Sequence, residues 1–266
     1  MPRKCKAGNN DMNEILTLDN ISLSYHTREG ETEALREISF GVRRGEFVAI
    51  VGPSGCGKTT ILSVVAGLLK PTAGTVTLDG RSVTAPGADV GYMLQKDTLF
   101  EWLTISKNVE LGLKIQKKLT EENKAYARAL LEKYGLMEFA EHYPGQLSGG
   151  MRQRAALIRT LAFRPKILLL DEPFSALDFQ TRLSVGEDVG EIIREEGVTA
   201  LLVTHDISEA ASLGSRIIVL SPRPAVIKKI FDVPLQGTAG QRRQSPGFSE
   251  MTNAVWNELS TAEARR

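Results

Sequence analysis

A strand, a glycine-rich turn and a helix follow directly on one another between residues 47 and 69. Phe47–Val51 is entirely apolar, and Gly52–Thr59 has the spacing Gly-x-x-x-x-Gly-Lys-Thr ahead of a mostly apolar helix. In this context glycines let backbone N–H groups wrap phosphates, Lys58 reaches the terminal phosphates and the Thr59 hydroxyl can hold Mg²⁺. The segment predicts an α/β fold with a phosphate-binding loop at the end of a central strand.

Apolar segments later in the sequence predict the rest of that sheet. Ile167–Leu170, Ala200–Thr204 and Arg216–Leu220 are separated by helical patterns near residues 180–196 and 207–212. Such alternation is typical of parallel strands that are covered by helices on both faces. The earlier strand patterns, in residues 15–23 and 38–51, are broken by glycines and predict an antiparallel region. The apolar helix that starts at Lys58 is expected to run to Leu69, because Lys70-Pro71 would end it.

A polar-rich helical block separates these two regions. Between Asn108 and Gly135 the pattern is helical, with Thr120 as the predicted N-cap and Glu121 and Glu122 in the first turn. We therefore predict a flexible leader at 1–13, one domain at 14–235 with a helical subdomain at about 97–160, and a linker with a short helix at 236–266. The last part is expected to be a solvated tail.

Charge and composition exclude several classes of protein. The chain has 266 residues, and 33 Lys+Arg balance 32 Asp+Glu, so no global field attracts nucleic acid or anionic lipid. Phe47–Val51 is the longest purely apolar run and is far too short to span a membrane. The polar leader lacks the apolar stretch of a secretion signal, so we expect a cytoplasmic protein. Cys5 and Cys56 are the two cysteines, and their places in the leader and the phosphate loop argue against a structural disulfide.

Two acidic residues close the apolar strand Ile167–Leu170. Asp171 lies at the carboxyl end of the strand, where parallel sheets bind ligands, and is predicted to hold Mg²⁺ through water. Glu172 is expected to point to the other face, where it acts as general base or positions the attacking water. An acidic pair at a strand end is common by itself. The assignment of these roles to Asp171 and Glu172 therefore depends on the phosphate loop earlier in the sequence.

The segment Leu147–Arg154 contains a second candidate anion site. Ser148, Gly149 and Gly150 open a helix, whose first backbone N–H groups and dipole attract anions. A chain that already has one phosphate cradle needs a second one only if the second serves another molecule.

Together these motifs resemble the ATP-binding cassette (ABC) ATPases, from about Leu16 to about Phe231. Leu147–Arg154 is similar to the family's signature motif, with Met151 where glutamine is commoner. The resemblance implies ATP hydrolysis with ATP and Mg²⁺ as ligands. It also implies an α/β P-loop fold with a parallel-sheet core, an antiparallel β subdomain and a helical signature subdomain. The implied ATP-binding residues are Tyr25, Gly52, Pro53, Ser54, Gly55, Cys56, Gly57, Lys58, Thr59 and Thr60.

Single residues outside the phosphate loop match further family positions. Tyr25 matches the aromatic residue that stacks on adenine, and Gln95 the glutamine that touches the metal and faces the membrane partner. His205 matches the histidine that contacts the γ-phosphate, and Asp178 looks like the aspartate that bridges two subunits. The implied catalytic residues are therefore Glu172, His205 and Gln95, and the implied metal ligands are Thr59, Gln95 and Asp171.

ATP sites are shared between two copies in this family. The resemblance thus implies a dimer, in which one copy contacts the other copy's ATP through Ser148, Gly149, Gly150 and Met151. Leu99–Thr104, with its aromatic side chains, is expected to form a groove for a partner helix.

Three short segments narrow the resemblance. Glu101–Thr104, Asn108-Val109 and Ser221–Pro224 together are similar to ATPase subunits of nitrate, sulfonate and taurine importers. This implies two membrane permease subunits, indirectly an external solute-binding protein, and a peripheral place on the cytoplasmic face of the membrane. No nucleic-acid partner is expected.

Two other classes were weighed against this interpretation. A cassette ATPase that acts on chromosomes or other nucleic acid would carry coiled-coil or zinc insertions, and the sequence has neither a heptad run nor paired Cys-x-x-Cys. A P-loop kinase or GTPase would lack the octapeptide Leu147–Arg154 and a counterpart of His205.

Overall fold

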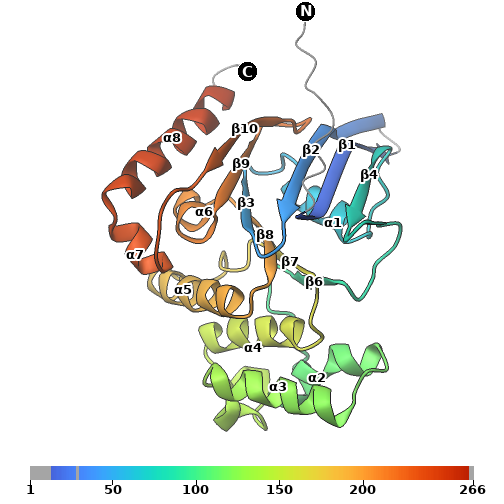
Figure 1. Cartoon of the computed structure of the whole chain (residues 1–266), viewed down its shortest axis with the longest axis vertical. Coiled ribbons are helices and arrows are strands. Elements are labelled where there is room, and N and C mark those ends of the chain that lie inside the picture. Colours follow the sequence, from blue (N-terminus) through green and yellow to red (C-terminus); the bar gives the residue numbers. More distant parts are fainter. Residues whose placement is uncertain (1–12, 28–29, 264–266) are drawn as a thin grey trace, which may run out of the picture.

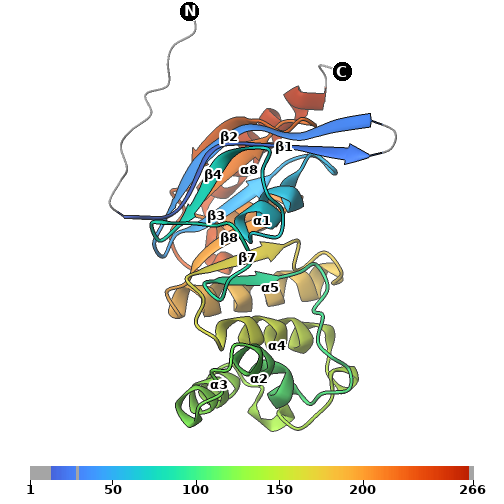
Figure 2. The ribbon, with the colours of Figure 1, turned by 90° about the vertical axis from the view of Figure 1, so that its right-hand side faces the viewer.

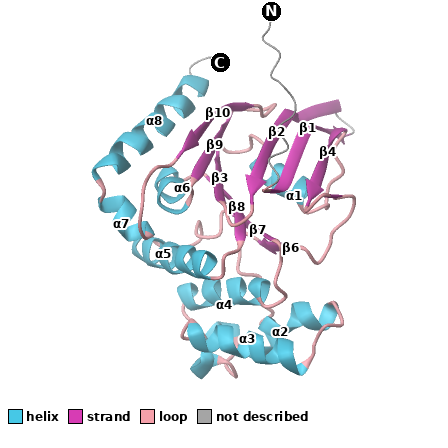
Figure 3. Cartoon of the chain, viewed as in Figure 1, coloured by secondary structure: helices cyan, strands magenta, loops and turns pink. Residues whose placement is uncertain are grey.

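Two sheets of different type form the body of the molecule (Figure 1; Figure 3). The structure is a computed structural model that describes residues 13–27 and 30–263, so almost all of the predicted leader, and Cys5, lie outside the described residues. The antiparallel sheet has the order β2-β1-β4-β5 and is formed by β1 (Glu14–Thr27), β2 (Gly30–Arg43), β4 (Ala73–Leu78) and β5 (Arg81–Ser82).

The second sheet has the order β10-β9-β3-β8-β7-β6 and is parallel except at one edge, where β10 pairs antiparallel with β9. Its strands are β3 (Phe47–Val51), β6 (Val90–Met93), β7 (Ile167–Asp171), β8 (Thr199–Thr204), β9 (Arg216–Leu220) and β10 (Ile227–Asp232). The predicted α/β fold with a parallel core and an antiparallel β region is confirmed.

Alternation along β3 explains how the layers assemble. Val48 and Ile50 face one side, where they pack with α1 (Lys58–Val65) and the antiparallel sheet, while Ala49 and Val51 face a second core of helices. Figure 2 shows α1 enclosed between the two sheets. Because successive side chains of a strand point to opposite faces, a strand buried on both faces must be apolar throughout.

Three helices gather at the end of the molecule away from the antiparallel sheet (Figure 1): α2 (Ile105–Ile115), α3 (Glu121–Lys133) and α4 (Gly149–Leu161). The Thr120 hydroxyl accepts a hydrogen bond from the Asn123 N–H, which confirms the predicted N-cap of α3. Short 3-10 turns at Met137–Phe139 and Pro144–Gln146 connect α3 to α4. Glu196, which follows α5 (Phe179–Glu195), binds this helical end to the core by accepting hydrogen bonds from Lys133 and Tyr134.

The helix after the phosphate loop is shorter than predicted. α1 ends at Val65, and the backbone then turns at Gly67, which has a φ of 70° and donates its N–H to the Val64 carbonyl. Glycine adopts this left-handed conformation without a Cβ penalty, so the stop signal lies before the predicted stop at Pro71.

The expectation of a solvated tail after residue 235 is wrong. The chain forms α7 (Ala239–Gln244) and α8 (Pro246–Glu263), which pack against α6 (Ile207–Leu213), β9 and β10. Val255 on α8 is fully buried, and Phe248, Met251 and Leu259 pack with it on the same core. This helical spacing gives α8 one apolar face, although its overall composition is polar. Of the helices within the described ranges, none combines the length and apolarity that a bilayer span requires.

Candidate active site

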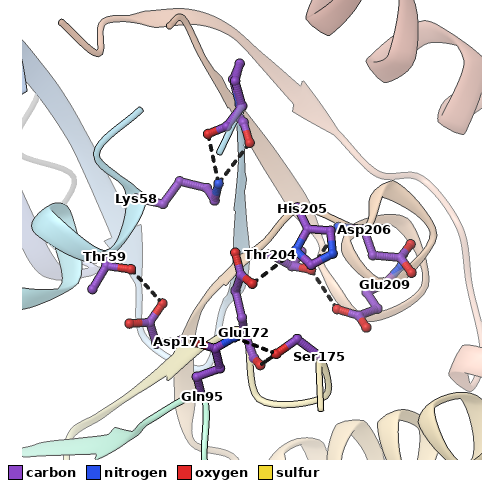
Figure 4. A network of polar contacts seen from close by, with 12 residues as sticks. Lys58, Thr59, Gln95, Asp171, Glu172, Ser175, Thr204, His205, Asp206 and Glu209 are labelled. Carbon is purple, nitrogen blue, oxygen red and sulfur yellow. Dashed lines mark hydrogen bonds and ion pairs between the residues drawn. The ribbon is translucent and has the colours of Figure 1, made fainter. Parts of the chain in front are cut away.

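Five parallel strands end at one edge of the core sheet, and the chain places its candidate residues there (Figure 4). The phosphate loop follows β3, Asp171 ends β7, His205 follows β8 and Gln95 comes two residues after β6. Ligands bind in open parallel sheets at the carboxyl ends of strands, so the topology brings together residues that are far apart in sequence.

The lysine of the phosphate loop is held by the loop itself. Lys58 is 5% exposed, and its Nζ donates to the carbonyls of Gly52 at 2.9 Å and Pro53 at 3.1 Å. An ammonium has three N–H donors, so a further one is available to a phosphate. Figure 4 shows Lys58 directed across the site above Asp171 and Glu172.

The loop needs glycine at position 57. Gly57 has a φ of 127°, and a Cβ there would lie 2.9 Å from the Leu35 side chain. The backbone of Gly57 therefore lies so close to β2 that a larger residue would clash with Leu35. Burial raises the pKa of the Cys56 thiol, as expected for a neutral side chain that fills space under the loop.

The phosphate loop opens onto a cavity of about 240 Å³. Its lining consists of Ser54, Gly55, Gly57, Lys58, Thr59, Thr60, Glu172 and Arg223. Two of these residues are cations and one is an acid, so the lining of the cavity carries both positive charge and a carboxylate.

Thr59 and Asp171 fit a magnesium ion. The Thr59 hydroxyl donates to Asp171 Oδ1 at 3.0 Å, and Tyr92 donates to Oδ2 at 3.3 Å. Hydroxyl and carboxylate oxygens are the ligands that Mg²⁺ prefers beside phosphates. Burial raises the pKa of Asp171 above the ordinary range, although the two hydrogen bonds oppose this shift. A divalent cation would compensate the buried carboxylate.

Glu172 and His205 form a hydrogen-bonded pair. His205 Nδ1 lies 3.0 Å from Glu172 Oε2, and the Glu172 side chain is only 22% exposed. Glu172 has a φ of 45°, and its N–H donates to the Val203 carbonyl of β8. The left-handed turn directs the Glu172 carboxylate away from Asp171 (Figure 4).

A buried polar network lies behind His205. The Thr204 hydroxyl donates to Glu209 Oε2 at 2.7 Å and accepts from the Asp206 N–H at 3.0 Å. Asp206 is the N-cap of α6 and accepts from the N–H groups of Ser208 and Glu209. Burial raises the pKa of Glu209. The hydrogen bonds of Thr204 and Asp206 therefore hold the chain on both sides of His205.

Gln95 and Tyr25 lie at the borders of the site. Gln95 Nε2 donates to Ser175 Oγ at 3.1 Å, so its amide is directed to the loop after Glu172 rather than to Asp171. Tyr25 on β1 is 36% exposed, and its hydroxyl lies 3.1 Å from Thr60 Oγ1. Metal contact by Gln95 and adenine stacking by Tyr25 stay predictions.

The signature segment forms a separate hollow. Ser148 is the N-cap of α4, and its hydroxyl accepts from the Met151 N–H at 3.3 Å. The start of α4 and the start of α5 enclose a cavity of about 620 Å³, and Asp178 caps α5 within it. The lining residues are Ser148, Gly149, Gly150, Met151, Arg152, Arg154, Ala176, Leu177, Asp178, Gln180, Thr181, Ser184, Val185 and Asp188.

Three residues near the site were not predicted. Tyr92 donates to Asp171, Arg223 donates to the Gly55 carbonyl at 2.8 Å, and Arg152 donates to Asp97 Oδ2 at 3.0 Å. The resemblance to importer ATPases covers Ser221–Pro224 but assigns no role to Arg223. Of these three residues, only Arg223 has a usable sequence signal, because it lies in the loop that follows a parallel strand, β9, and such loops face the ligand edge.

A phosphate loop at the end of a central parallel strand, with a strand-end aspartate beside its threonine, defines a P-loop nucleotide-binding protein. The chain belongs to the ABC transporter family, whose profile matches residues 35–175.

Relatives and solved structures agree with this assignment. The chain is 47% identical to an uncharacterized ABC transporter ATP-binding protein, YtlC, of Bacillus subtilis, over 95% of this chain and 98% of YtlC. It is 43% identical to the nitrate import ATP-binding protein NrtD of Synechocystis, over 84% of each chain. The dimeric ATP-binding cassette MJ0796 bound to ADP and Pi is 33% identical, with a TM-score of 0.69 over 84% of this chain and 99% of that chain. This chain is accordingly an ATP-binding ATPase with the ABC fold.

Proposed function

We propose that two copies of this chain bind two ATP molecules between them, and that hydrolysis drives solute import through separate permease subunits. The observation that carries the proposal is the separation of the two half-sites. Within the described residues, the linings of the phosphate-loop cavity and the signature cavity have no member in common. A second copy can bring its α4 N-terminus to the ATP that the first copy holds. The dimeric cassette MJ0796 supports this arrangement.

Each side chain then has a chemical task. Lys58 and the loop N–H groups bind the phosphates, and Glu172 takes a proton from the attacking water or orients it. His205 holds the Glu172 carboxylate through Nδ1, so its Nε2 can contact the γ-phosphate. Mg²⁺, held by Thr59 and Asp171, would neutralise charge on the phosphates. Asp178 and the signature residues complete the site from the second copy.

An apolar groove supports a permease partner. A cavity of about 300 Å³ lies between the loop after β6 and the helical subdomain, and its lining is mainly apolar: Tyr92, Thr98, Phe100, Leu111, Gly112, Ile115, Arg159, Thr160 and Phe163. Beside it Trp102 is 72% exposed, with its ring centroid 5.0 Å from that of Phe100. Exposed aromatic residues around an apolar hollow suit a short helix of a membrane subunit.

The groove is connected to the ATP site. Arg159 on α4 donates to the carbonyls of Thr98 and Asp97, which follow Gln95. Movement of a partner in the groove would therefore act on Gln95 and α4 together.

A chain that binds a membrane permease in this way would lie against the membrane. We therefore propose that it is peripheral, on the cytoplasmic face.

The resemblance to importer ATPases and the relative NrtD point to small oxyanions such as nitrate, sulfonates or taurine as the transported solutes. These solutes would be bound by an external binding protein and the permease rather than by this chain. A role on nucleic acid is not favoured by these relatives.

Mixed dimers test the shared site. Lys58→Ala and Ser148→Arg chains should each be inactive alone, because each lacks one half of both sites. Mixed dimers would contain one intact site, so an equimolar mixture should recover about a quarter of the wild-type ATPase rate if copies pair at random. Mixing two separate Lys58→Ala preparations is the control. A mixture that stays as inactive as that control would contradict the shared site.

A further inference from the structure

The loop after β9 supplies a residue to the phosphate site that the motifs do not include. In the sheet order β9-β3-β8-β7-β6, the last four strands lead to the phosphate loop, His205, Asp171 and Gln95. β9 ends beside β3, with which it pairs in parallel. Its next residues, 221–226, must therefore emerge next to the phosphate loop.

This loop is fixed in place from both ends. Ser221 Oγ accepts from the Val226 N–H at 3.0 Å and closes the turn. Ala225 exchanges backbone hydrogen bonds with β2, donating to the Ala34 carbonyl and accepting from the Arg36 N–H, both at 2.9 Å. The Ala225 side chain also faces Gly57 of the phosphate loop. Arg223 is thus carried by a scaffold that packs on the loop it contacts.

The contact of Arg223 is with the tip of the phosphate loop. Its guanidinium donates to the Gly55 carbonyl at 2.8 Å. The N–H of the same peptide unit, that of Cys56, donates to the Pro53 carbonyl at 3.2 Å. The peptide plane between Gly55 and Cys56 is therefore held on both sides. A guanidinium has five N–H donors, and a single carbonyl leaves others for an anion.

Charge gives this contact a chemical meaning. Arg223 lines the same cavity as Lys58, Thr59 and Glu172, and Lys58 and Arg223 are the two cations of that lining. Arginine suits phosphate because its planar fork can donate two parallel hydrogen bonds to phosphate oxygens.

We propose that Arg223 is a second phosphate-binding cation of the nucleotide site, delivered by β9 in addition to Lys58 from β3. This inference rests on ATP binding by the phosphate loop. Arg223 contributes its charge to the terminal phosphates, and ATP gains more from it than ADP does because ATP has one more phosphate group.

Four variants separate charge from loop support: Arg223→Ala, Arg223→Gln, Arg223→Lys and, as the control, Arg81→Ala. Gln keeps an N–H donor for the Gly55 carbonyl without the charge, whereas Lys keeps the charge. Arg81 is an exposed arginine on β5. The Kd values for ATP and ADP are measured on the isolated chain, and thermal unfolding without nucleotide confirms that each variant is folded.

We expect the Ala and Gln variants to bind ATP about tenfold more weakly, since hydrogen bonds to charged groups are the strong ones. The loss for ADP should be smaller, and the Lys variant should recover most of the affinity. Two results would overturn the proposal: an Ala variant with the affinity of Arg81→Ala, or a Gln variant with wild-type affinity, which would reduce Arg223 to a support of the loop. Wild-type chain that binds no nucleotide would instead contradict the proposed function.

Discussion

His205 and Glu172 are hydrogen-bonded across the ends of two neighbouring parallel strands, with 3.0 Å between Nδ1 and Oε2. The carboxylate fixes the orientation of the ring, and the ring in turn fixes the carboxylate. The two residues that we propose to act on the attacking water and the γ-phosphate are therefore held as one unit.

Removing either member should have almost the full effect of removing both. Glu172→Gln and His205→Ala should each slow hydrolysis by roughly 100-fold or more, as loss of a general base does, while ATP still binds. The double variant should be little slower than either single variant, because residues that act as a unit are not additive. Single-turnover phosphate release measures this. If the losses of the two single variants multiplied in the double variant, that result would contradict joint action of Glu172 and His205.

A second measurement tests whether ATP stays bound. The ATP-bound dimer of Glu172→Gln should persist in size-exclusion chromatography.

Asp171 should reduce stability when no metal is present. Burial raises its pKa, so the folded state disfavours the charged form at neutral pH. Asp171→Asn should therefore raise the melting temperature in EDTA at neutral pH. The gain should disappear as the pH falls from the raised folded-state pKa to the ordinary aspartate value of about 3.9, below which both states are protonated.

Asp79 provides a control of opposite sign. Hydrogen bonds from Lys166 and Arg44 lower its pKa, so its charged form favours folding above the ordinary aspartate pKa. Asp79→Asn should lower the melting temperature slightly at neutral pH, and the loss should vanish as the pH falls through the lowered folded-state pKa.

Metal binding gives a further test of Asp171. Mg²⁺ with ATP should stabilise the wild-type chain but not Asp171→Asn. A destabilised Asp171→Asn in EDTA would show that the carboxylate is structural.

Arg152 connects the signature helix to the loop after β6. Its Nε donates to Asp97 Oδ2 and its Nη1 to the Leu147 carbonyl, both at 3.0 Å. In a double-mutant cycle of Arg152→Ala and Asp97→Ala, the rate of ATP hydrolysis is measured for each variant. We expect a coupling free energy of about 1 kcal/mol from these rates. The exposed pair Arg44 and Asp79, at 2.7 Å, should give no coupling in the same assay. Equal coupling in both cycles would contradict a connection through Arg152.

Only the buried face of α8 should contribute to the stability of the fold. Val255 is fully buried on α8, whereas its neighbour Trp256 is 61% exposed. Val255→Ala should lower the free energy of unfolding by roughly 1–3 kcal/mol through loss of buried methyl groups. Trp256→Ala should change it by less than about 0.5 kcal/mol, as surface substitutions do. Urea denaturation measures both, and equal effects would contradict the packing of α8.

Elements with strong local patterns could be predicted from the sequence. β9 was predicted with the bounds Arg216–Leu220 that the structure has, because an apolar strand between helices is a clear pattern. The sequence does not predict β6 and β10, since β6 has four residues and β10 has two adjacent lysines and no fully buried position. Short edge strands owe their conformation to pairing rather than to composition.

The candidate site shows the same division. Asp171 and His205 could be predicted because each stands at the end of a recognisable strand, and Lys58 because of the glycine spacing before it. The structure brings all three to one edge of the sheet. Arg223 could not be assigned, because its contact depends on how the loop after β9 packs on β2 and on the phosphate loop. Such contacts join segments that are more than 160 residues apart in the chain.

The left-handed conformation of Glu172 gives the two adjacent acidic residues of the site different supports. Asp171 is a strand residue and is fixed by the register of β7 with β8. Glu172 is held by Val203 and His205, and its own carbonyl accepts from the hydroxyl of Ser175, the same residue that receives the amide of Gln95. A displacement of the loop after β6 would therefore reach the backbone of Glu172 through Gln95 and Ser175, whereas Asp171 is held by the register of β7 with β8.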